Sequence, residues 1–158
     1  MANSLHIHVR SLEIGDFDFV RDLASRQPNF TVPPPYVLWL LLRIKGSVCL
    51  IAEMVDEGQL AYLLALPVEG PTESLFVWQL AAKETKLEDR GVLALLTELR
   101  NLVRARHVRT VLFSAPPNSA KQRLIAHYTN MLVAVTPRLI SILPASVTSN
   151  EGEYRVDL

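Results

Sequence analysis

Two different spacings of hydrophobic residues occur along this chain. Near the start, Leu5, Ile7 and Val9 alternate with polar residues, which is the two-residue period of a half-buried strand. After Gly91, apolar residues recur every three or four positions, which predicts a long amphipathic helix. The stretch 59–68 is apolar on both faces, so it predicts a central strand that is covered on both sides. The chain therefore mixes strands with helices.

The order of the elements predicts an α/β (α+β) fold with three layers, in which helices cover both faces of a central mixed sheet of about six to seven strands. The helix expected over 36–44 is apolar nearly all round, so we expect it to be largely buried. The predicted elements, in chain order, are a strand at 5–10, helices at 17–26 and 36–44, strands at 47–54, 59–68 and 74–82, a helix opened by Gly91, a strand at 109–114, a helix beginning near Asn118, and strands at 132–135 and 154–158.

The composition is that of an ordinary globular protein. The length of 158 residues predicts one domain over residues 1–158. Apolar residues make up 49% and charged residues 20% of the sequence, which excludes a disordered chain. The 16 basic and 16 acidic residues give a formal net charge of zero, and the arginines are scattered. Because binding to phosphate backbones needs a basic surplus or a basic stripe, we expect no nucleic-acid partner.

Cys49 is the only cysteine of the sequence, and it lies in an apolar, strand-like run. No disulfide can form within the chain, which favours a reducing compartment. We interpret Cys49 as a small buried hydrophobic residue rather than a nucleophile. The first residues lack the apolar core of a signal peptide, and the apolar run 37–42 is too short to cross a bilayer. We therefore expect a cytoplasmic protein with no membrane partner.

Two histidines, His6 and His8, lie on one face of the first predicted strand and could ligate a metal. No third ligand with suitable spacing is visible in the sequence. The polar outer face of a strand accounts for both histidines, so we expect no metal site.

The stretch 74–91 has the pattern of an anion site. An apolar strand leads through a short charged loop to Gly91, where a helix is expected to begin. The backbone N–H groups of a helix start and the helix dipole both attract negative charge. We therefore expect a phosphate group of a ligand to bind at this point.

Four segments carry a resemblance to a known family: LPVEGPTE at 66–73, SLFVWQLA at 74–81, APPNSA at 115–120 and EYRVDL at 153–158. In this order they resemble the GNAT superfamily of acetyl-CoA-dependent N-acetyltransferases, and most closely the diaminobutyrate acetyltransferases of ectoine biosynthesis. The resemblance implies a transfer of the acetyl group of acetyl-CoA to the primary amine of a small molecule, by direct attack in a ternary complex. It also implies a possible homodimer.

The resemblance assigns coenzyme A to the end of the strand 74–82 and to the following helix. The backbones of Leu80 and Ala82 would contact the pantetheine arm, and Asn118 would face the cofactor. A phosphate loop would be formed by Arg90, Gly91, Val92 and Leu93. The sequence departs from the family pattern in this loop, because the acidic Glu88 replaces a cation or amide and Leu93 replaces a very small residue.

The resemblance also assigns the acceptor pocket. Tyr36, Trp78, Gln79 and either Glu153 or its neighbour Glu151 would face the amine, and the strand period predicts that Trp78 and Gln79 point to opposite faces. The span 30–36 reads FTVPPPY and lacks the carboxylate that relatives use to pair with an ammonium group. The departure points away from diaminobutyrate and toward a less cationic or more apolar acceptor.

Acetyl transfer also needs groups that move protons. Tyr128 is a candidate acid, although a core tyrosine on an apolar helix face would have the same sequence context. Glu53 is a candidate base, and the alternative is a solvated strand end. A catalytically degenerate GNAT-like binding or interaction module remains the alternative function, which Glu88 and Leu93 favour. A third possibility is the use of a longer acyl-CoA or of a protein amine.

Overall fold

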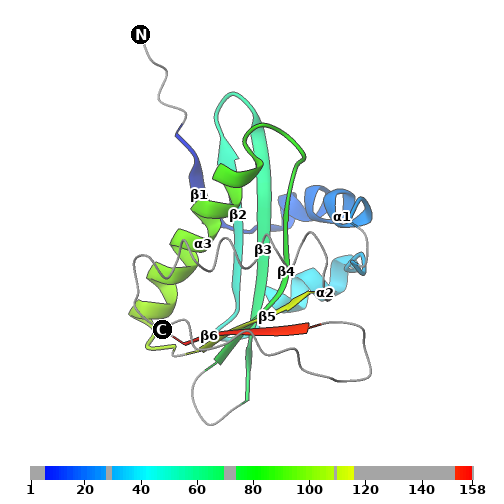
Figure 1. The fold of residues 1–158 in the computed structure, drawn as a ribbon. Helices are drawn as coiled ribbons and strands as arrows, with labels where there is room; N and C mark the ends of the chain where they lie inside the picture. Colours follow the sequence, from blue (N-terminus) through cyan, green and yellow to red (C-terminus); the bar gives the residue numbers. More distant parts are fainter. Residues whose placement is uncertain (1–5, 28–29, 70–73, 109, 116–151, 158) are drawn as a thin grey trace.

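The computed structural model describes residues 6–27, 30–69, 74–108, 110–115 and 152–157. The described strands form one sheet of six strands, which lie side by side in chain order (Figure 1). Neighbouring strands are antiparallel, except that β4 and β5 are parallel. The strands are β1 (His8–Ser11), β2 (Val48–Met54), β3 (Gly58–Val68), β4 (Ser74–Ala82), β5 (Thr110–Ala115) and β6 (Gly152–Asp157). The helices are η1 (Ile14–Asp16), a short 3-10 helix, followed by α1 (Phe17–Ser25), α2 (Pro35–Leu41) and α3 (Glu88–Ala105).

Helices cover both faces of the sheet, so the fold has three layers. On one face, α3 packs across β1 to β4 and closes a core cluster that includes Leu63, Leu95 and Leu99. On the other face, α1 and α2 close a second cluster that includes Val20, Leu38 and Tyr62 (Figure 1). The predicted mixed α+β class with helices on both faces is therefore confirmed.

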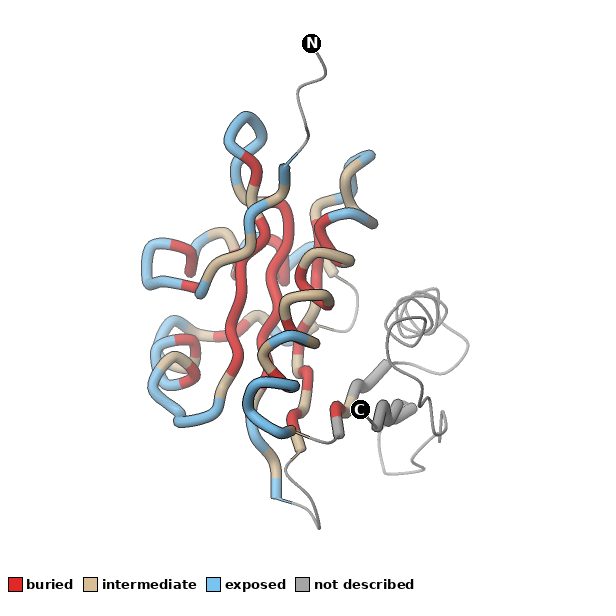
Figure 2. Tube along the Cα trace, turned by 90° about the vertical axis from the view of Figure 1, so that its left-hand side faces the viewer, coloured by how far each residue is buried: buried red, intermediate tan, exposed pale blue. Residues whose placement is uncertain are grey.

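The strand β3 is buried over its middle part, from Leu60 to Ala65, and Figure 2 shows the buried parts of the sheet in red. Its odd residues Ala61, Leu63 and Ala65 belong to the cluster under α3, whereas Tyr62 and Leu64 belong to the cluster under α1 and α2. Successive side chains of a strand point to opposite faces, so a strand between two helical layers is apolar at every position. The prediction of a central strand covered on both sides is confirmed.

The helix α2 differs from its prediction. It ends at Leu41, and only Leu38 and Leu41 of its seven residues are buried. Tyr36 and Leu40 are exposed. A helix of two turns that touches the rest of the molecule along one side leaves its other side in water, even where that side is apolar. The expectation of a largely buried helix over 36–44 is therefore wrong.

The helix α3 begins at Glu88 and not at Gly91. The residues before it are held by Thr85, whose carbonyl accepts from the N–H of Glu88 at 3.1 Å and whose hydroxyl accepts from the N–H of Leu87 at 3.1 Å. The N–H of Gly91 donates to the carbonyl of Leu87 at 2.9 Å, which is an ordinary helical bond. The prediction that Gly91 opens the helix is therefore wrong by one turn.

Gly91 instead allows α3 to approach β3 closely. A Cβ atom at this position would lie 3.4 Å from the Cβ of Ala61 and 3.7 Å from the Cβ of Leu60. One carbon fits at that distance in ordinary contact, but a longer side chain does not. Packing between the helix and the strand thus explains a small residue at this position.

We predict that Gly91→Ala keeps the protein as stable as the native chain or stabilises it by up to about 1 kcal/mol, because alanine favours the helix and its Cβ meets only ordinary contacts. Gly91→Leu should destabilise it by about 1–3 kcal/mol through overpacking. Urea unfolding of both variants measures this, with Asn101→Leu on the exposed side of α3 as the control. A Gly91→Leu protein as stable as that control would contradict the packing role.

Candidate functional site

The strands β4 and β5 pair over only part of their length. Pairing runs from Ser74 and Thr110 to Val77 and Phe113 and then stops, although β4 continues to Ala82 and β5 to Ala115. In Figure 1, β4 runs up the picture from this point, whereas β5 and β6 run across it. The two parallel strands therefore diverge in the middle of the sheet.

A β-bulge in β4 marks the point of divergence. Opposite β3, Gln79 pairs with Leu64 and Val77 pairs with Ala65, so Trp78 is an extra residue without a partner. A bulge places two consecutive residues on the same side of a strand and bends it. Accordingly, Trp78 packs against the cluster under α1 and α2, and Gln79 bonds to a residue of the same cluster. The prediction that Trp78 and Gln79 point to opposite faces is wrong for this reason.

Beyond the bulge, β4 turns an unpaired backbone edge toward the diverging β5. The N–H of Lys83 donates to the carbonyl of Leu60 at 2.8 Å, so Lys83 bonds toward β3. Backbone groups alternate along an antiparallel strand, which directs the N–H and C=O groups of Leu80 and Ala82 the other way. No strand of the described residues pairs with β4 on that side over residues 78–82. Two predicted cofactor residues thus lie on the open edge.

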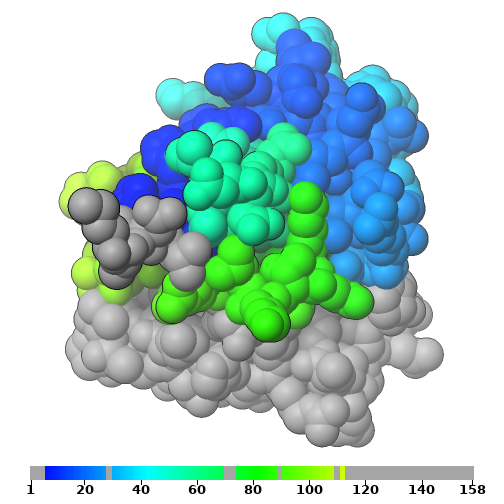
Figure 3. All heavy atoms as spheres, turned by 90° about the horizontal axis from the view of Figure 1, so that it is seen from above, coloured from blue at the N-terminus to red at the C-terminus, as the bar shows by residue number. Residues whose placement is uncertain are grey.

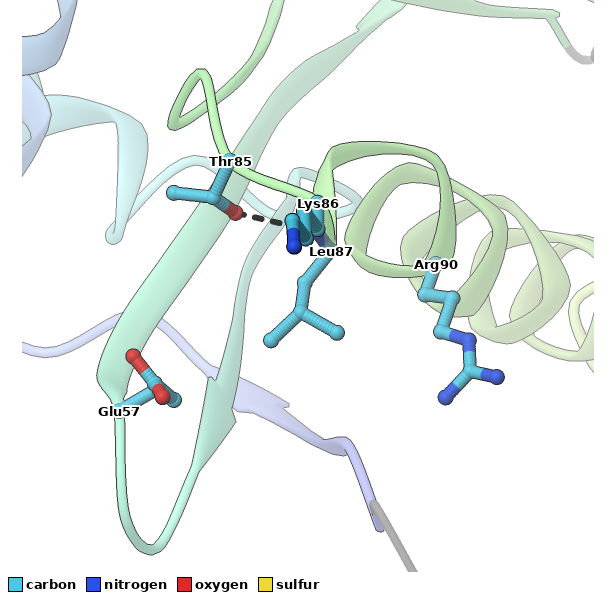
Figure 4. A pocket seen from close by; sticks show the side chains of 5 residues that line it. All are labelled: Glu57, Thr85, Lys86, Leu87 and Arg90. Atoms are coloured by element: carbon cyan, nitrogen blue, oxygen red, sulfur yellow. Dashed lines mark hydrogen bonds between the residues drawn. The ribbon is translucent and has the colours of Figure 1, made fainter.

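The first turn of α3 lies just after this edge, at a solvent-facing end of the molecule. Figure 3 looks onto that end and shows the green atoms of the β4–α3 connection at the surface, between the β2–β3 hairpin and α1. An open cavity of about 470 Å³ is lined there by Glu57, Thr85, Lys86, Leu87 and Arg90 (Figure 4). It combines two cationic side chains with the positive end of the helix dipole, which suits an anion, although it also contains one carboxylate.

The predicted phosphate loop 90–93 lies inside the helix. Val92 is buried in the core under α3, and the N–H groups of Gly91, Val92 and Leu93 fall where helical bonds use them. Helix starts leave the first few N–H groups free. Arg90 is in that first turn, and no acceptor for its N–H occurs among the hydrogen bonds of the described residues. The available donors of α3 therefore lie before Gly91.

Gln79 ties β4 to its neighbours on the α1 and α2 side. It is 3% exposed. Its Oε1 accepts from the hydroxyl of Tyr62 at 2.9 Å, and its Nε2 donates to the carbonyl of Thr31 at 2.8 Å. Burial raises the pKa of the Tyr62 hydroxyl, so this group stays a neutral donor. The bonds attach the loop between α1 and α2 to the strand beside the bulge.

Glu53, the predicted base, is part of a charged cluster around Arg10. The Nε and Nη2 of Arg10 donate to the two carboxylate oxygens of Glu53 at 3.0 and 3.1 Å. The same guanidinium donates to both oxygens of Asp16 at 2.7 and 2.8 Å. Since both oxygens of Glu53 already accept from a cation, this carboxylate is placed to join β1 to β2 rather than to take a proton from a substrate.

Asp16 is the buried member of this cluster. Burial raises the pKa of its carboxyl, but hydrogen bonds from Arg10, from the backbone N–H of Glu13 and from Gln59 outweigh burial and hold the pKa below its ordinary value. The bonds that Arg10 donates to Asp16 and to Glu53 raise the pKa of its guanidinium. The pair is therefore charged at neutral pH and connects β1, η1, β2 and β3.

Of the remaining predicted site residues, the structure describes some and not others. Tyr36 is 66% exposed in the first turn of α2. Glu153 lies in β6 opposite Ser114, and its side chain is outside the described residues. Asn118 and Tyr128, together with the helix and the strand predicted after residue 118, also lie outside the described residues.

Burial raises the pKa of Cys49 to about 11, so the thiol stays protonated and is unsuited to act as a nucleophile.

The described part of the chain contains no group of three or more histidine, cysteine, aspartate or glutamate residues that could hold a metal. None of its helices is long and apolar enough to cross a bilayer.

Sequence reasoning missed several residues of this region. Arg10 and Lys86 stand among many scattered charges, and no local signal distinguishes them. Thr85 could have been found, because a threonine three residues before Glu88 is a recognised helix-start signal. The bulge at Trp78 has no sequence signal such as a glycine, so it could not have been predicted.

The chain has the fold of the GNAT N-acetyltransferases. Diaminobutyrate acetyltransferase EctA from Paenibacillus lautus, solved with its substrate and coenzyme A, matches with a TM-score of 0.69 and 23% identity, over 98% of this chain and 95% of that chain. NAA60 from Arabidopsis thaliana, solved with a bisubstrate analogue, matches with a TM-score of 0.72 and 11% identity, over 97% of each chain. The aminoglycoside 6′-N-acetyltransferase from Enterococcus faecium matches with a TM-score of 0.64 and 11% identity, over 96% of each chain.

These similarities support the superfamily fold and do not single out one branch. EctA has the higher identity of the three, whereas NAA60 has the higher TM-score. No protein-family model matches the sequence. No curated protein matches it either.

We predict that the Asp16–Arg10 pair makes stability depend on pH. Because the pKa of Asp16 is lowered by folding, its contribution is fully present above the ordinary carboxyl pKa of about 3.9 and is lost as the pH falls through the lower folded value. Asp16→Asn should destabilise the protein at pH 7 by roughly 1–4 kcal/mol, between the values for exposed and buried pairs. It should also weaken the loss of stability below about pH 4.

Urea unfolding from pH 7 down to pH 3 measures both effects. Asp18→Asn is the matched control, because Asp18 is an exposed aspartate two residues away in α1. An Asp16→Asn protein with the native pH dependence would show that the cluster does not link stability to pH.

Proposed function

We propose that this protein is an acetyl-CoA-dependent N-acetyltransferase that acts on the primary amine of a small molecule, by direct attack in a ternary complex. The observation that carries the proposal is the divergence of β4 from β5 after Val77, at a bulge and directly before the first turn of α3. The divergence exposes backbone donors and acceptors in the interior of a sheet, where a strand would normally pair with them.

The residues at this opening fit an extended acyl thioester with a phosphate group. The N–H and C=O groups of Leu80 and Ala82 can bond to the amide groups of a pantetheine arm as a neighbouring strand would. Lys86 and Arg90 can bind a phosphate, together with the N–H of Arg90, for which the described residues show no acceptor. Coenzyme A would supply the activated acyl group as a thioester. In this proposal Gly91, Val92 and Leu93 hold α3 against the sheet.

In this proposal the protein accelerates the transfer mainly by positioning the two reactants and by placing hydrogen-bond donors beside them. An amine held against the acyl carbon reacts much faster than one in solution, because binding has already fixed its place and orientation. A backbone N–H on the open edge of β4 can donate to the oxygen on which negative charge develops. Trp78 and Tyr36 are proposed to border the acceptor, and Gln79 is proposed to fix the loop beside it.

The roles of Tyr128 as the acid, of Asn118 near the cofactor and of Glu153 near the acceptor are also proposed, on the resemblance alone. Glu53 receives no catalytic role, because Arg10 occupies its carboxylate. A cytoplasmic location, an absence of nucleic-acid and membrane partners and a possible homodimer complete the proposal.

A catalytically degenerate binding module is the second candidate function. The observation that favours it is the position of Glu88 as the first residue of α3, where a carboxylate competes with a phosphate for the positive end of the helix. Glu57 places a further carboxylate in the cavity beside the first turn of α3. Under this reading the fold remains and cofactor binding is lost.

We predict that acetyl-CoA stabilises the protein. A ligand that binds only the folded state adds about 2.7 kcal/mol at a concentration of 100 times its Kd, which raises the melting temperature by several degrees. Glu88→Gln should tighten the binding several-fold by removing a negative charge, whereas Arg90→Glu should weaken it by about tenfold or more. Lys45→Glu, at an exposed site in the α2–β2 connection, is the control with the same charge change as Arg90→Glu.

A thermal-shift titration of the four proteins with acetyl-CoA measures these effects. No shift of the native protein at millimolar acetyl-CoA would reject the enzyme and favour the binding module. A shift that Arg90→Glu and Lys45→Glu reduce equally would place the cofactor elsewhere.

A further inference from the structure

Five half-buried residues are linked to the bulge through Gln79 and Tyr62, and we call them the bulge wall: Phe19, Phe30, Val32, Trp78 and Lys83. The four apolar members pack against the cluster under α1 and α2. The ammonium group of Lys83 lies 5.5 Å from the centre of the Phe19 ring, and that ring meets Tyr62 edge to face at a centroid distance of 6.4 Å. The wall is therefore apolar and carries one positive charge.

The wall is held in place by bonds to the loop that carries Phe30 and Val32. The carbonyl of Thr31 accepts from Gln79 at 2.8 Å, and the carbonyl of Pro33 accepts from the Nε of Arg21 at 3.2 Å. Both bonds fix backbone atoms, so the loop keeps its position against β4 and α1. A surface that is already ordered does not lose further entropy when it binds a ligand.

The acidic side chains of η1, α1 and β2 are not available to a cationic ligand at the wall. Arg10 holds the carboxylates of both Asp16 and Glu53. Asp18 and Asp22 are exposed, and the helical period places them on the side of α1 that faces away from the sheet. Within η1, α1 and β2, no carboxylate is therefore left to pair with an ammonium group at the wall.

We propose that the acceptor is a primary amine carried on an apolar group, with no second cation. The inference rests on the proposed function and specifies its substrate class. An aryl or alkyl group would be buried against Trp78 and its neighbours, which is favourable. A second ammonium group would lose water at the bulge wall, where η1, α1 and β2 provide no free carboxylate, and Lys83 would repel it.

The reaction is the ordinary aminolysis of a thioester. The nitrogen of the neutral amine bonds to the acyl carbon as the carbon–sulfur bond breaks, and the proton that the nitrogen releases ends on the leaving thiolate. The products are an N-acyl amine and a free thiol, so no further reactant is needed.

A comparison of matched amines tests the substrate class. With saturating acetyl-CoA, thiol release gives kcat/KM for 2-phenylethylamine, 1,4-diaminobutane and 2,4-diaminobutyrate, and calorimetry with the protein loaded with coenzyme A gives their affinities. We expect 2-phenylethylamine to exceed both diamines by at least about tenfold in affinity and in kcat/KM. A diamine that equals or exceeds it, in either measurement, would overturn the inference.

A charge reversal at Lys83 tests the role of the wall itself. The side chain of Lys83 is partly exposed, and its backbone bond to Leu60 does not depend on the side chain. Lys83→Glu should raise kcat/KM for 1,4-diaminobutane by at least about tenfold relative to 2-phenylethylamine, because it replaces a repelling charge by a pairing one. Lys45→Glu is the control and should leave the preference unchanged. An equal preference in native and Lys83→Glu proteins would remove Lys83 from the site.

Two separate readouts distinguish this inference from the proposed function. The stabilisation of each protein by acetyl-CoA is measured on the same samples. Stabilisation with a preference for diamines contradicts only the inference about the acceptor, whereas no stabilisation of the native protein contradicts the proposed function and this inference with it.

Discussion

The arrangement of the described residues depends on one interruption of the sheet, the extra residue Trp78 in β4. Because β4 bulges there, it bends away from β5 after Val77 and loses its hydrogen-bond partner on that side. A sheet interior tolerates unpaired backbone groups only where another partner can reach them. The same bulge brings Trp78 and Gln79 to one face. A single local irregularity thus creates both the open edge that we propose to bind the cofactor and the wall that we propose to border the acceptor.

The surrounding structure keeps this irregularity in place. Gln79 is bonded to β3 through Tyr62 and to the α1–α2 loop through Thr31, so the strand is held directly beyond the bulge. On the opposite face, α3 packs closely over β3 at Gly91, a position that accommodates only a small residue. The ion pairs of Arg10 join β1, η1 and β2 at the far edge of the sheet. The site is therefore open within a rigid frame.

The sequence was sufficient for the fold class and for most strands. The continuous apolar run of β3 follows from burial on two faces, and the helical period of α3 follows from burial on one face. The predictions from the sequence failed where contacts between particular residues determine the structure. The helix α3 starts one turn before the predicted Gly91, because Thr85 accepts hydrogen bonds from the N–H groups of Leu87 and Glu88. The helix α2 is exposed because it contacts the rest of the molecule along one side only. The role of Glu53 depended on Arg10, which is 43 residues away in the chain. Such long-range pairing leaves no periodic signal in a sequence.

The claim that the unpaired edge of β4 receives a cofactor can be tested at single residues by amide hydrogen exchange followed by nuclear magnetic resonance. Without ligand, the amides of Gln79 and Ala81 should exchange slowly because they bond to β3, whereas those of Leu80 and Ala82 should exchange fast. Coenzyme A should slow Leu80 and Ala82 and leave the other two unchanged. Slow exchange at Leu80 and Ala82 without ligand, or no slowing when coenzyme A is bound, would contradict the account.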